Sequence, residues 1–161
     1  MKITTTLTEK DFIRVTFYML YSKLLTRLIT GIGVLMLLAA IAGTVVGVKN
    51  GGVFQWAFAV FMLIGIPLST YYSARRNYVA NTRISETITY GFFPEHLAIT
   101  GESFQSTLTW HKVHKVSRSK NWILIWQNAQ IANVIPARAI QPSELPVLRQ
   151  LLATNRVPNN L

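Results

Sequence analysis

Two long uncharged stretches dominate the first half of the chain. The first covers residues 28–48, between Arg27 and Lys49, and the second covers residues 51–74, ending before Arg75. A bilayer core about 30 Å thick is crossed by roughly 20 helical residues at about 1.5 Å each. Neither stretch has the polar face that a surface helix of a soluble protein carries. The pattern therefore predicts two transmembrane helices rather than two buried helices of a soluble bundle.

The link between these stretches, Lys49-Asn50-Gly51-Gly52, is short and rich in turn-forming residues. It predicts an antiparallel hairpin whose two ends lie on the same side of the membrane. An excess of Lys and Arg marks the cytoplasmic side. The turn contains only Lys49, whereas seven cations flank the open end: Lys10, Arg14, Lys23, Arg27, Arg75, Arg76 and Arg83. Both termini are therefore predicted to be cytoplasmic.

A cleaved signal peptide is the competing interpretation of the first stretch, because Ala40-Ile41-Ala42 resembles a cleavage site. The preceding region is 27 residues long and patterned, which is too much for the charged start of a signal peptide. Within the second stretch, Pro67 predicts a kink. Small residues on the first stretch, Gly31, Gly33, Gly43 and Gly47, predict close helix contact, either within the hairpin or between chains.

The residues before the hairpin predict a strand and a helix. Residues 2–7 alternate, with Ile3 and Leu7 opposed by threonines, and Thr8 is a candidate N-cap. Apolar residues then recur at helical spacing: Ile13, Phe17, Leu20, Leu24 and Leu28. This helix either lies along the headgroup layer or extends the first span toward the cytoplasm. Its expected role is a stalk packed on the cytoplasmic domain rather than a distinct membrane-binding device.

After Arg76 the pattern becomes β-like, with about five strands arranged as an antiparallel meander. Their apolar positions are Ile84, Ile88 and Tyr90; Leu97 and Ile99; Phe104, Leu108 and Trp110; Trp122 to Trp126; and Ile131 to Ile135. A closing helix begins near Ser143, with a stripe of Leu145, Leu148, Leu151 and Leu152, and Pro146 in its first turn. A meander of this size needs a further element to form a core, and the amino-terminal strand is expected to complete the sheet.

The predicted organisation has three parts. Residues 1–27 form the strand and juxtamembrane helix, residues 28–74 form the hairpin, and residues 75–161 form a cytoplasmic β domain. Trp110, Val113 and Val116 recur every three residues, so they cannot all face the core from a straight strand. A bulge or one helical turn is expected there.

Composition excludes several classes of protein. The 161 residues contain 50% apolar and 14% charged residues, whereas soluble domains carry roughly a quarter charged residues. Such hydrophobicity also excludes a disordered chain. Cysteine is absent, which rules out disulfides, thiolate catalysis and Cys-ligated zinc. With 16 Lys and Arg against 6 Asp and Glu, the net charge is +10, so polyanions are the expected partners.

Candidate chemistry is sparse. Three histidines, His96, His111 and His114, are the right type of residue for zinc, but Lys112 and Lys115 beside them disfavour a divalent cation. Glu86 is either a general base or, more simply, a structural partner of Arg83 or Arg138 at the sheet edge. The sequence contains no glycine-rich phosphate loop and no nucleophile elbow. We therefore expect no enzyme, no cofactor and no metal site.

The basic residues are the candidate contact site. Those expected to touch anionic lipid or a protein partner are Arg75, Arg76, Lys112, Lys115, Arg118 and Lys120. For a tethered domain the inner leaflet is a nearer polyanion than nucleic acid, and each cation close to it contributes about 1 kcal/mol. The spans carry no ionisable residue, which disfavours a transporter or channel built from one hairpin. A homo-oligomer remains open.

The stretch from Thr87 to Leu152 resembles the YcxB-like family of bacterial membrane proteins. The resemblance rests on Phe93-Pro94-Glu95-His96-Leu97, Ser103, the Trp110–Val113–Val116 spacing, Trp122-Ile123-Leu124-Ile125-Trp126, Ile135-Pro136-Ala137-Arg138-Ala139-Ile140 and the closing helix. It implies a two-span hairpin ahead of a PH-like β domain capped by a C-terminal helix, in the bacterial inner membrane. It supplies no catalytic residues. Ala137 stands where a basic residue is common in the family, which argues against phosphate binding by that loop.

The sequence thus predicts an α+β membrane protein, a helical hairpin anchoring a cytoplasmic PH-like antiparallel β domain. The leading functional hypothesis is an interaction module that binds a protein or anionic lipid. The alternative is an immunity or regulatory protein that neutralises a toxin in the bilayer or controls a membrane partner. Exchanging both spans for unrelated apolar helices separates the two, because only the alternative needs the hairpin sequence.

Overall fold

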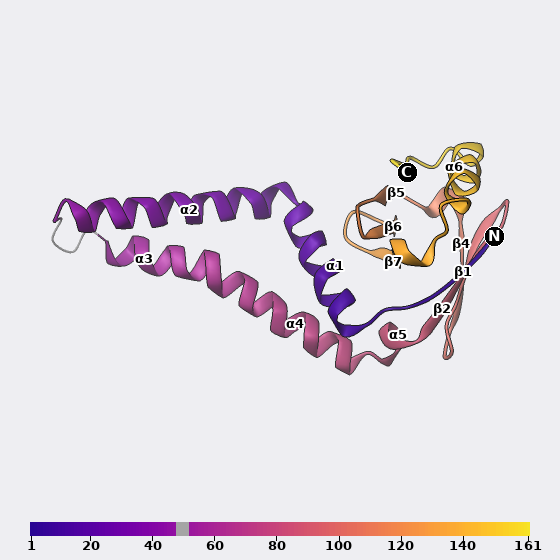
Figure 1. Cartoon of the computed structure of the whole chain (residues 1–161), viewed down its shortest axis with the longest axis horizontal. Helices are drawn as coiled ribbons and strands as arrows, with labels where there is room; N and C mark the ends of the chain where they lie inside the picture. Colours follow the sequence, from indigo (N-terminus) through magenta and orange to yellow (C-terminus); the bar gives the residue numbers. More distant parts are fainter. Residues whose placement is uncertain (48–51) are drawn as a thin grey trace. The chain divides into compact units, whose positions relative to one another are not determined.

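The computed structural model describes residues 1–47 and 52–161 as an α+β chain with two units. One unit contains Phe12–Ala80 and is helical; the other contains Met1–Asp11 and Asn81–Leu161 and holds the sheets and the C-terminal helix (Figure 1). The turn predicted at residues 49–52 falls outside the described residues except for Gly52, which is the N-cap of the helix that follows.

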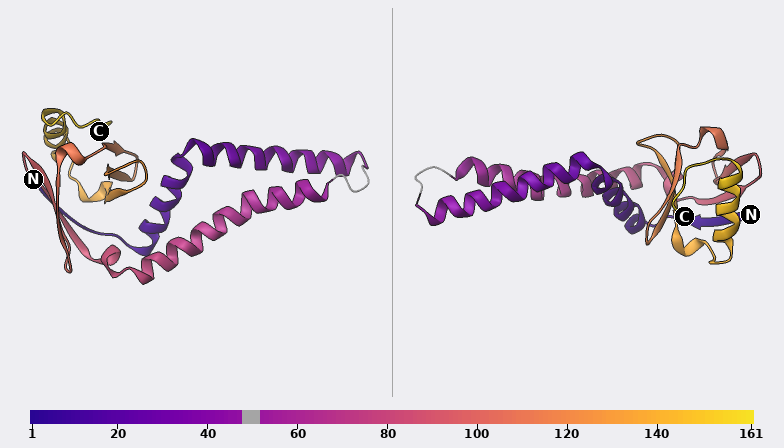
Figure 2. Two further views of the ribbon diagram at one scale, coloured as in Figure 1. Left: turned by 180° about the vertical axis from the view of Figure 1, so that it is seen from behind. Right: turned by 90° about the horizontal axis from the view of Figure 1, so that it is seen from above.

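The helical unit consists of α1 (Glu9–Ser22), α2 (Leu24–Val45) and a second long rod. That rod runs from Val53 to Ala80 and comprises α3 (Val53–Val60), a π-helical turn (Phe61–Gly65) and α4 (Ile66–Ala80). Helix α2 and the rod are long and apolar enough to cross a membrane. Figure 2 shows the two rods from two further directions.

Helix α1 does not continue straight into α2, although the apolar spacing runs through both. Lys23 interrupts the helix with extended backbone angles, φ −78° and ψ 131°. The Arg27 side chain crosses the corner, with its Nε donating to the Tyr21 carbonyl at 2.8 Å. The chain therefore changes direction between α1 and α2 (Figure 1). The change of direction argues against one interpretation of this helix given above, because α1 is not a simple extension of the first long rod.

The interruption predicted at Pro67 takes the form of the π-helical turn just before it. Proline has no N–H to donate and its ring crowds the carbonyl one turn earlier. A π-helical turn widens the helix at this point, so the rod continues to Ala80. The rod therefore also extends past Arg76, where the sequence pattern had indicated a change to strands.

Small residues bring α2 and α3 together within the hairpin. Gly33 is buried, and a Cβ atom at that position would lie 3.0 Å from the Cβ of Met62. Ala40 of α2 and Ala59 of α3 are fully buried as well. Gly31, in contrast, has no neighbour within 4 Å of an added Cβ. Of the two contacts left open by the sequence, Gly33 makes the one within the hairpin.

Replacing Gly33 with Leu is expected to destabilise the hairpin by about 1–3 kcal/mol, because the new side chain has no space beside Met62. Thermal unfolding of the full chain in detergent, monitored by the helical signal in far-ultraviolet circular dichroism, measures this effect. Gly31→Leu is the matched control, since the same residue is added two positions away in open space. Equal melting temperatures for the two variants would contradict the packing described here.

The β unit contains seven strands in two antiparallel sheets. The first sheet has the order β1 (Lys2–Thr6), β2 (Thr87–Phe92), β3 (His96–Thr100) and β4 (Gln105–Thr109). The second contains β5 (Lys115–Arg118), β6 (Trp122–Trp126) and β7 (Ala132–Pro136). Ile3 lies opposite Tyr90, which confirms that the amino-terminal strand completes the sheet formed after the hairpin.

The expected strand through Ile84 is wrong. Residues Thr82–Ser85 form a single helical turn, α5, and β2 starts only at Thr87. Local hydrogen bonds hold this turn: the Ile84 N–H donates to the Asn81 carbonyl at 3.0 Å, and the Ser85 hydroxyl donates to the Thr82 carbonyl at 2.9 Å. These contacts within the segment outweigh its short alternating pattern.

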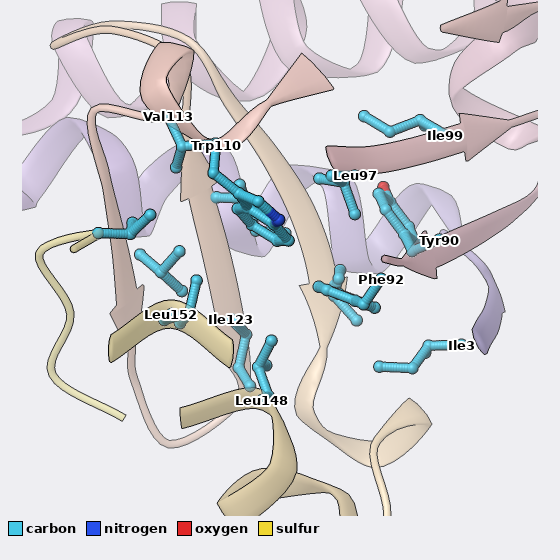
Figure 3. Packing of buried hydrophobic residues seen from close by; sticks show 14 of the residues in the cluster. Ile3, Tyr90, Phe92, Leu97, Ile99, Trp110, Val113, Ile123, Leu148 and Leu152 are labelled. Carbon is cyan, nitrogen blue, oxygen red and sulfur yellow. The ribbon is translucent and has the colours of Figure 1, made fainter. Parts of the chain in front are cut away.

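Trp110, Val113 and Val116 all reach the core, as the three-residue spacing required (Figure 3 labels the first two). A 3-10 turn, η2 (Trp110–Lys112), joins β4 to β5 and supplies the expected helical turn. The Trp110 ring stacks on Phe92 with a centroid distance of 6.3 Å, and its Nε1 donates to the Phe93 carbonyl at 3.0 Å. The turn therefore carries the chain from one sheet to the next without losing the apolar face.

Both sheets and the C-terminal helix share one core. Helix α6 (Glu144–Thr154) buries Leu148 and Leu152 against Ile123 and its neighbours (Figure 3). Ser143 is its N-cap by position, but its side chain makes no capping bond; the Glu144 carboxylate accepts from the Gln141 N–H at 2.8 Å instead. Between the sheets, the Tyr90 hydroxyl donates to the Val134 carbonyl at 3.4 Å, and burial raises the Tyr90 pKa.

Candidate functional site

The cations singled out on the sequence fall into two groups, one in each unit. Arg75 and Arg76 lie on α4 and, with Tyr72, Val79 and Ala80, line a shallow hollow of about 440 Å³. Tyr72 and Val79 are 60% and 70% exposed. Cations beside exposed aromatic and aliphatic side chains are typical of the membrane–water boundary. The hollow is formed by this single helix, so it is a surface feature rather than an enclosed pocket.

The second group lies in the β unit, in the segment 112–120 around β5, which we call the β5 arm. Lys112 is in η2, Lys115 and Arg118 are in β5, and Lys120 is in the turn before β6. The Lys115 ammonium lies 5.5 Å from the centre of the Trp126 ring. Side chains alternate along a strand, so Arg118 points to the face opposite Lys115. Lys115 and Arg118 therefore do not belong to one patch on the strand.

The Trp126 ring packs under the Lys115 side chain of the β5 arm. The Trp126 Nε1 donates to the Ser117 hydroxyl at 2.7 Å, which fixes the ring beneath the Lys115 ammonium. Trp122 and Leu124 are buried together with Trp126, although their alternate neighbours Ile123 and Ile125 already fill the core. Strand β6 is thus buried on both faces.

Glu86 hydrogen-bonds to Ser103, whereas Arg83, one of the two arginines named from the sequence, makes only a weaker charge interaction with it. Its carboxylate accepts from the Ser103 hydroxyl at 2.5 Å and from the Ser103 N–H at 2.9 Å. These two hydrogen bonds, the hydroxyl one above all, lower the Glu86 pKa. Arg83 lies over the Phe104 ring at 5.7 Å. A Cβ at Gly101 would approach both Phe104 and a Glu86 oxygen within 2.7 Å, so this tight β3–β4 turn is a structural feature.

Arg138 pairs with Asp11, a contact that sequence reasoning missed. Its Nη1 and Nη2 donate to the two Asp11 oxygens at 3.1 and 2.5 Å. Asp11 also belongs to the capping box of α1, because its carboxylate accepts from the Thr8 N–H and its own N–H donates to the Thr8 hydroxyl. The Arg138 hydrogen bond is the main cause that lowers the Asp11 pKa to about 2.

Acid is expected to weaken this contact. The Asp11 pKa is about 2 in the folded chain and near its ordinary value, about 3.9, when unfolded. The stabilisation is therefore complete above about pH 4 and is lost as the pH falls from about 4 to about 2. We expect about 1 kcal/mol, because solvent screens the 60% exposed Arg138 side chain.

The measurement is thermal unfolding of the full chain in detergent between pH 7 and pH 2.5, followed by tryptophan fluorescence. Arg138→Gln should lower the melting temperature at neutral pH and flatten its decline in acid. Arg118→Gln removes an exposed cation of the same unit and serves as control. A decline in acid that is identical in wild type and Arg138→Gln would show that this pair contributes nothing.

The histidines do not converge. His96 stacks on Phe93 at 4.8 Å, the His111 Nε2 lies 3.5 Å from the Thr109 hydroxyl, and the His114 N–H donates to the Trp126 carbonyl. In residues 1–47 and 52–161 there is no group of three His, Cys, Asp or Glu side chains close enough to hold a metal ion.

A second feature missed from the sequence is a polar cleft within the helical unit. It encloses about 390 Å³ between α1 and α4, and its lining residues are Phe12, Thr16, Ser69, Thr70, Ser73, Ala74 and Asn77. The ring of Phe12 on α1 lies 6.0 Å from that of Tyr78 on α4. The available signal was the four-residue spacing of Ser69, Ser73 and Asn77 in an apolar stretch.

These observations define an α+β protein with two helices long and apolar enough to span a membrane, followed by antiparallel sheets and a C-terminal helix. Residues 92–152 match the family described as YcxB-like protein, which confirms the family resemblance of the β domain. No curated protein matches the chain. No solved structure matches it.

Proposed function

We propose that the chain is an integral protein of the bacterial inner membrane that holds a PH-like interaction module on the cytoplasmic side. The observation that carries this proposal is the exposed apolar surface of the hairpin. Only 11% of the apolar window of α2 and 6% of that of the second rod is buried. Leu35, Phe54 and Phe61 are each more than 60% exposed. A soluble protein does not leave such a surface in water, whereas lipid chains cover it.

The pairing of β1 with β2 supports an even number of membrane crossings in the segment of the chain between these two strands. Strand β1 precedes the hairpin and β2 follows it, yet the two form one ladder from Lys2–Gly91 to Thr6–Thr87. The ends of the hairpin therefore lie on one side of the membrane. The excess of Lys and Arg at those ends favours the cytoplasm. Cleavage near Ala40 is disfavoured, because it would separate β1 from the sheet it completes.

The β unit supports the interaction role by its architecture and charge. Two antiparallel sheets with a C-terminal helix packed on the shared core are the arrangement implied by a PH-like fold. The cations on the β5 arm and Arg76 on α4 support a contact with anionic headgroups, each contributing about 1 kcal/mol. We propose that the β unit is a non-enzymatic module that binds anionic lipid or a protein partner rather than nucleic acid.

Carbonate extraction and protease protection test the membrane arrangement. Full-length protein should stay in the membrane fraction at alkaline pH, and protease outside intact spheroplasts should leave residues 81–161 uncut. Disruption of the spheroplasts should then expose them. Release by carbonate, or digestion from outside, would overturn the proposal.

Tryptophan quenching tests the anionic-lipid contact separately. The Trp56→Phe chain in nanodiscs loses the tryptophan of the hairpin, so the remaining three report on the β unit. Brominated phosphatidylglycerol should quench their fluorescence more than brominated phosphatidylcholine does. Combined Lys112→Glu, Lys115→Glu, Arg118→Glu and Lys120→Glu substitutions should abolish the difference. Equal quenching by the two lipids in the starting protein would exclude the contact.

The immunity or regulatory alternative makes a different demand on the hairpin. An anchor tolerates any two apolar helices of the same length, whereas a partner-recognising hairpin requires its own sequence. Partners captured from native membranes with the full chain should persist after exchange of both spans if the β unit makes the contact. Loss of all partners on that exchange would favour the alternative.

A further inference from the structure

The cleft between α1 and α4 offers hydrogen-bond acceptors to a ligand. Thr16 donates its hydroxyl proton to the Phe12 carbonyl at 2.8 Å. Ser69 and Thr70 donate theirs to the Ile66 carbonyl at 2.9 and 2.8 Å. A hydroxyl whose proton is used in this way still has two oxygen lone pairs. Three of the four hydroxyls in the lining therefore accept hydrogen bonds, and a ligand rich in N–H or O–H donors fits them.

The position of the cleft along the second rod indicates the depth of the ligand. Ser69 and Asn77 lie about 24 Å and about 36 Å along the helix from Val53, at about 1.5 Å per residue. These values bracket the far edge of a hydrocarbon core about 30 Å thick. If the rod crosses the membrane, as proposed above, the cleft opens at the level of the phospholipid headgroups.

A cation lies on the helix face next to the cleft. Arg76 follows Ser73 by three residues, so the two side chains are neighbours on the helix surface. Arg76 is exposed and lines the hollow next to Tyr72. The cleft thus offers hydroxyl acceptors and has no charged residue in its lining, while Arg76 lies on the neighbouring face of the same helix. A ligand that carries both a donor-bearing cation and a phosphate matches both parts.

We propose that this cleft binds the headgroup of an aminophospholipid, with its primary ammonium donating to the Thr16, Ser69 and Thr70 hydroxyl oxygens and its phosphate pairing with Arg76. The ethanolamine headgroup has three N–H donors on its ammonium. The choline headgroup has the same charge and phosphate but no N–H. A volume of about 390 Å³ lies within the range of small-ligand sites, roughly 300–1,000 Å³. The site therefore selects ethanolamine over choline lipids. This inference rests on the proposed membrane insertion of the hairpin.

The test compares phosphatidylethanolamine and phosphatidylcholine with identical acyl chains on the purified full chain. Native mass spectrometry counts the lipids retained as the detergent is stripped. Loss of one or two hydrogen bonds to a charged group changes affinity about tenfold, which is the preference expected for ethanolamine. Thr16→Val combined with Thr70→Val keeps the side-chain shape, removes both hydroxyls and should abolish this preference. Arg76→Gln should weaken both lipids equally.

Thr44→Val is the matched control. Its hydroxyl also donates to a helix carbonyl, that of Ile41 at 2.7 Å, but it lies near the other end of α2. This variant should keep the full preference. Equal retention of the two lipids by the starting protein would overturn the proposal, as would an unchanged preference in the Thr16 and Thr70 variant. A dimer mass that disappears in the same variant would also overturn it, because a second copy would then occupy the cleft.

Carbonate extraction of the same preparations keeps this result apart from the broader proposal. Protein that resists extraction but shows no ethanolamine preference contradicts the cleft alone. Protein that is released by carbonate contradicts the membrane arrangement, and the headgroup site is overturned with it.

Discussion

Replacing Ile3 with Asp is expected to unfold the β unit of the chain. Ile3 is 2% exposed and lies in the core with Tyr90, its partner across the β1–β2 ladder. A carboxylate at this position loses its hydration without gaining a partner, or takes up a proton to avoid the charge. We expect a cost above about 4 kcal/mol, which approaches the whole stability of a small domain.

Near-ultraviolet circular dichroism of the full chain in detergent measures this loss, since three of the four tryptophans lie in the β unit. The control is Thr4→Asp, one residue further along β1, where the side chain is exposed and bonds only to the Thr89 hydroxyl. It should cost less than about 1 kcal/mol. Retention of the tryptophan signal in Ile3→Asp would show that the β unit folds without β1. The β1–β2 pairing would then no longer support the proposal that both ends of the hairpin lie on the same side of the membrane.

Replacing Trp110 with Ala is expected to cost about 3–5 kcal/mol. The ring is 3% exposed, stacks on Phe92 and fills the space where η2 leads from the first sheet to the second. Its removal leaves a cavity between the sheets and leaves the Phe93 carbonyl without its N–H donor. Denaturant unfolding of the full chain, monitored by the fluorescence of Trp122 and Trp126, measures this free energy.

Trp110→Phe separates the two contributions to that cost. A phenyl ring restores most of the buried area but donates no hydrogen bond to Phe93. The expected cost is about 1–2 kcal/mol, between the wild type and the alanine variant. If the alanine and phenylalanine variants were equally unstable, the indole N–H rather than the ring volume would be the dominant contribution.

The main elements of the fold could be predicted because each one leaves a periodic signal. Uncharged stretches longer than 20 residues define the two rods, and the Leu148 and Leu152 stripe defines the last helix. The turn at Trp110 was predictable from geometry, since a spacing of three residues is incompatible with a strand of period two. These signals are local and involve many residues of one kind.

The features that were missed depend on pairs of segments. Asp11 and Arg138 are 127 residues apart in the sequence, and no local pattern around either residue predicts the other as its partner. Ile84 was assigned to the alternating pattern of Ile88 and Tyr90, but the local hydrogen bond from its N–H to Asn81 places it in a helical turn instead. The Ser69 and Ser73 spacing was visible, but its meaning required knowing that α1 turns at Lys23 and lies beside α4.

The ladder between β1 and β2 sets an order of events during synthesis. Ile3 leaves the ribosome first but finds its partner Tyr90 only after the entire hairpin has been made. Until then the β2 edge that pairs with β1 is open, and the core lacks the Ile3 side chain. If the rods cross a membrane, as proposed above, this sheet closes only when both ends of the hairpin lie on the same side. The β1–β2 ladder thus makes the folding of the β unit depend on the path that the chain takes through the hairpin.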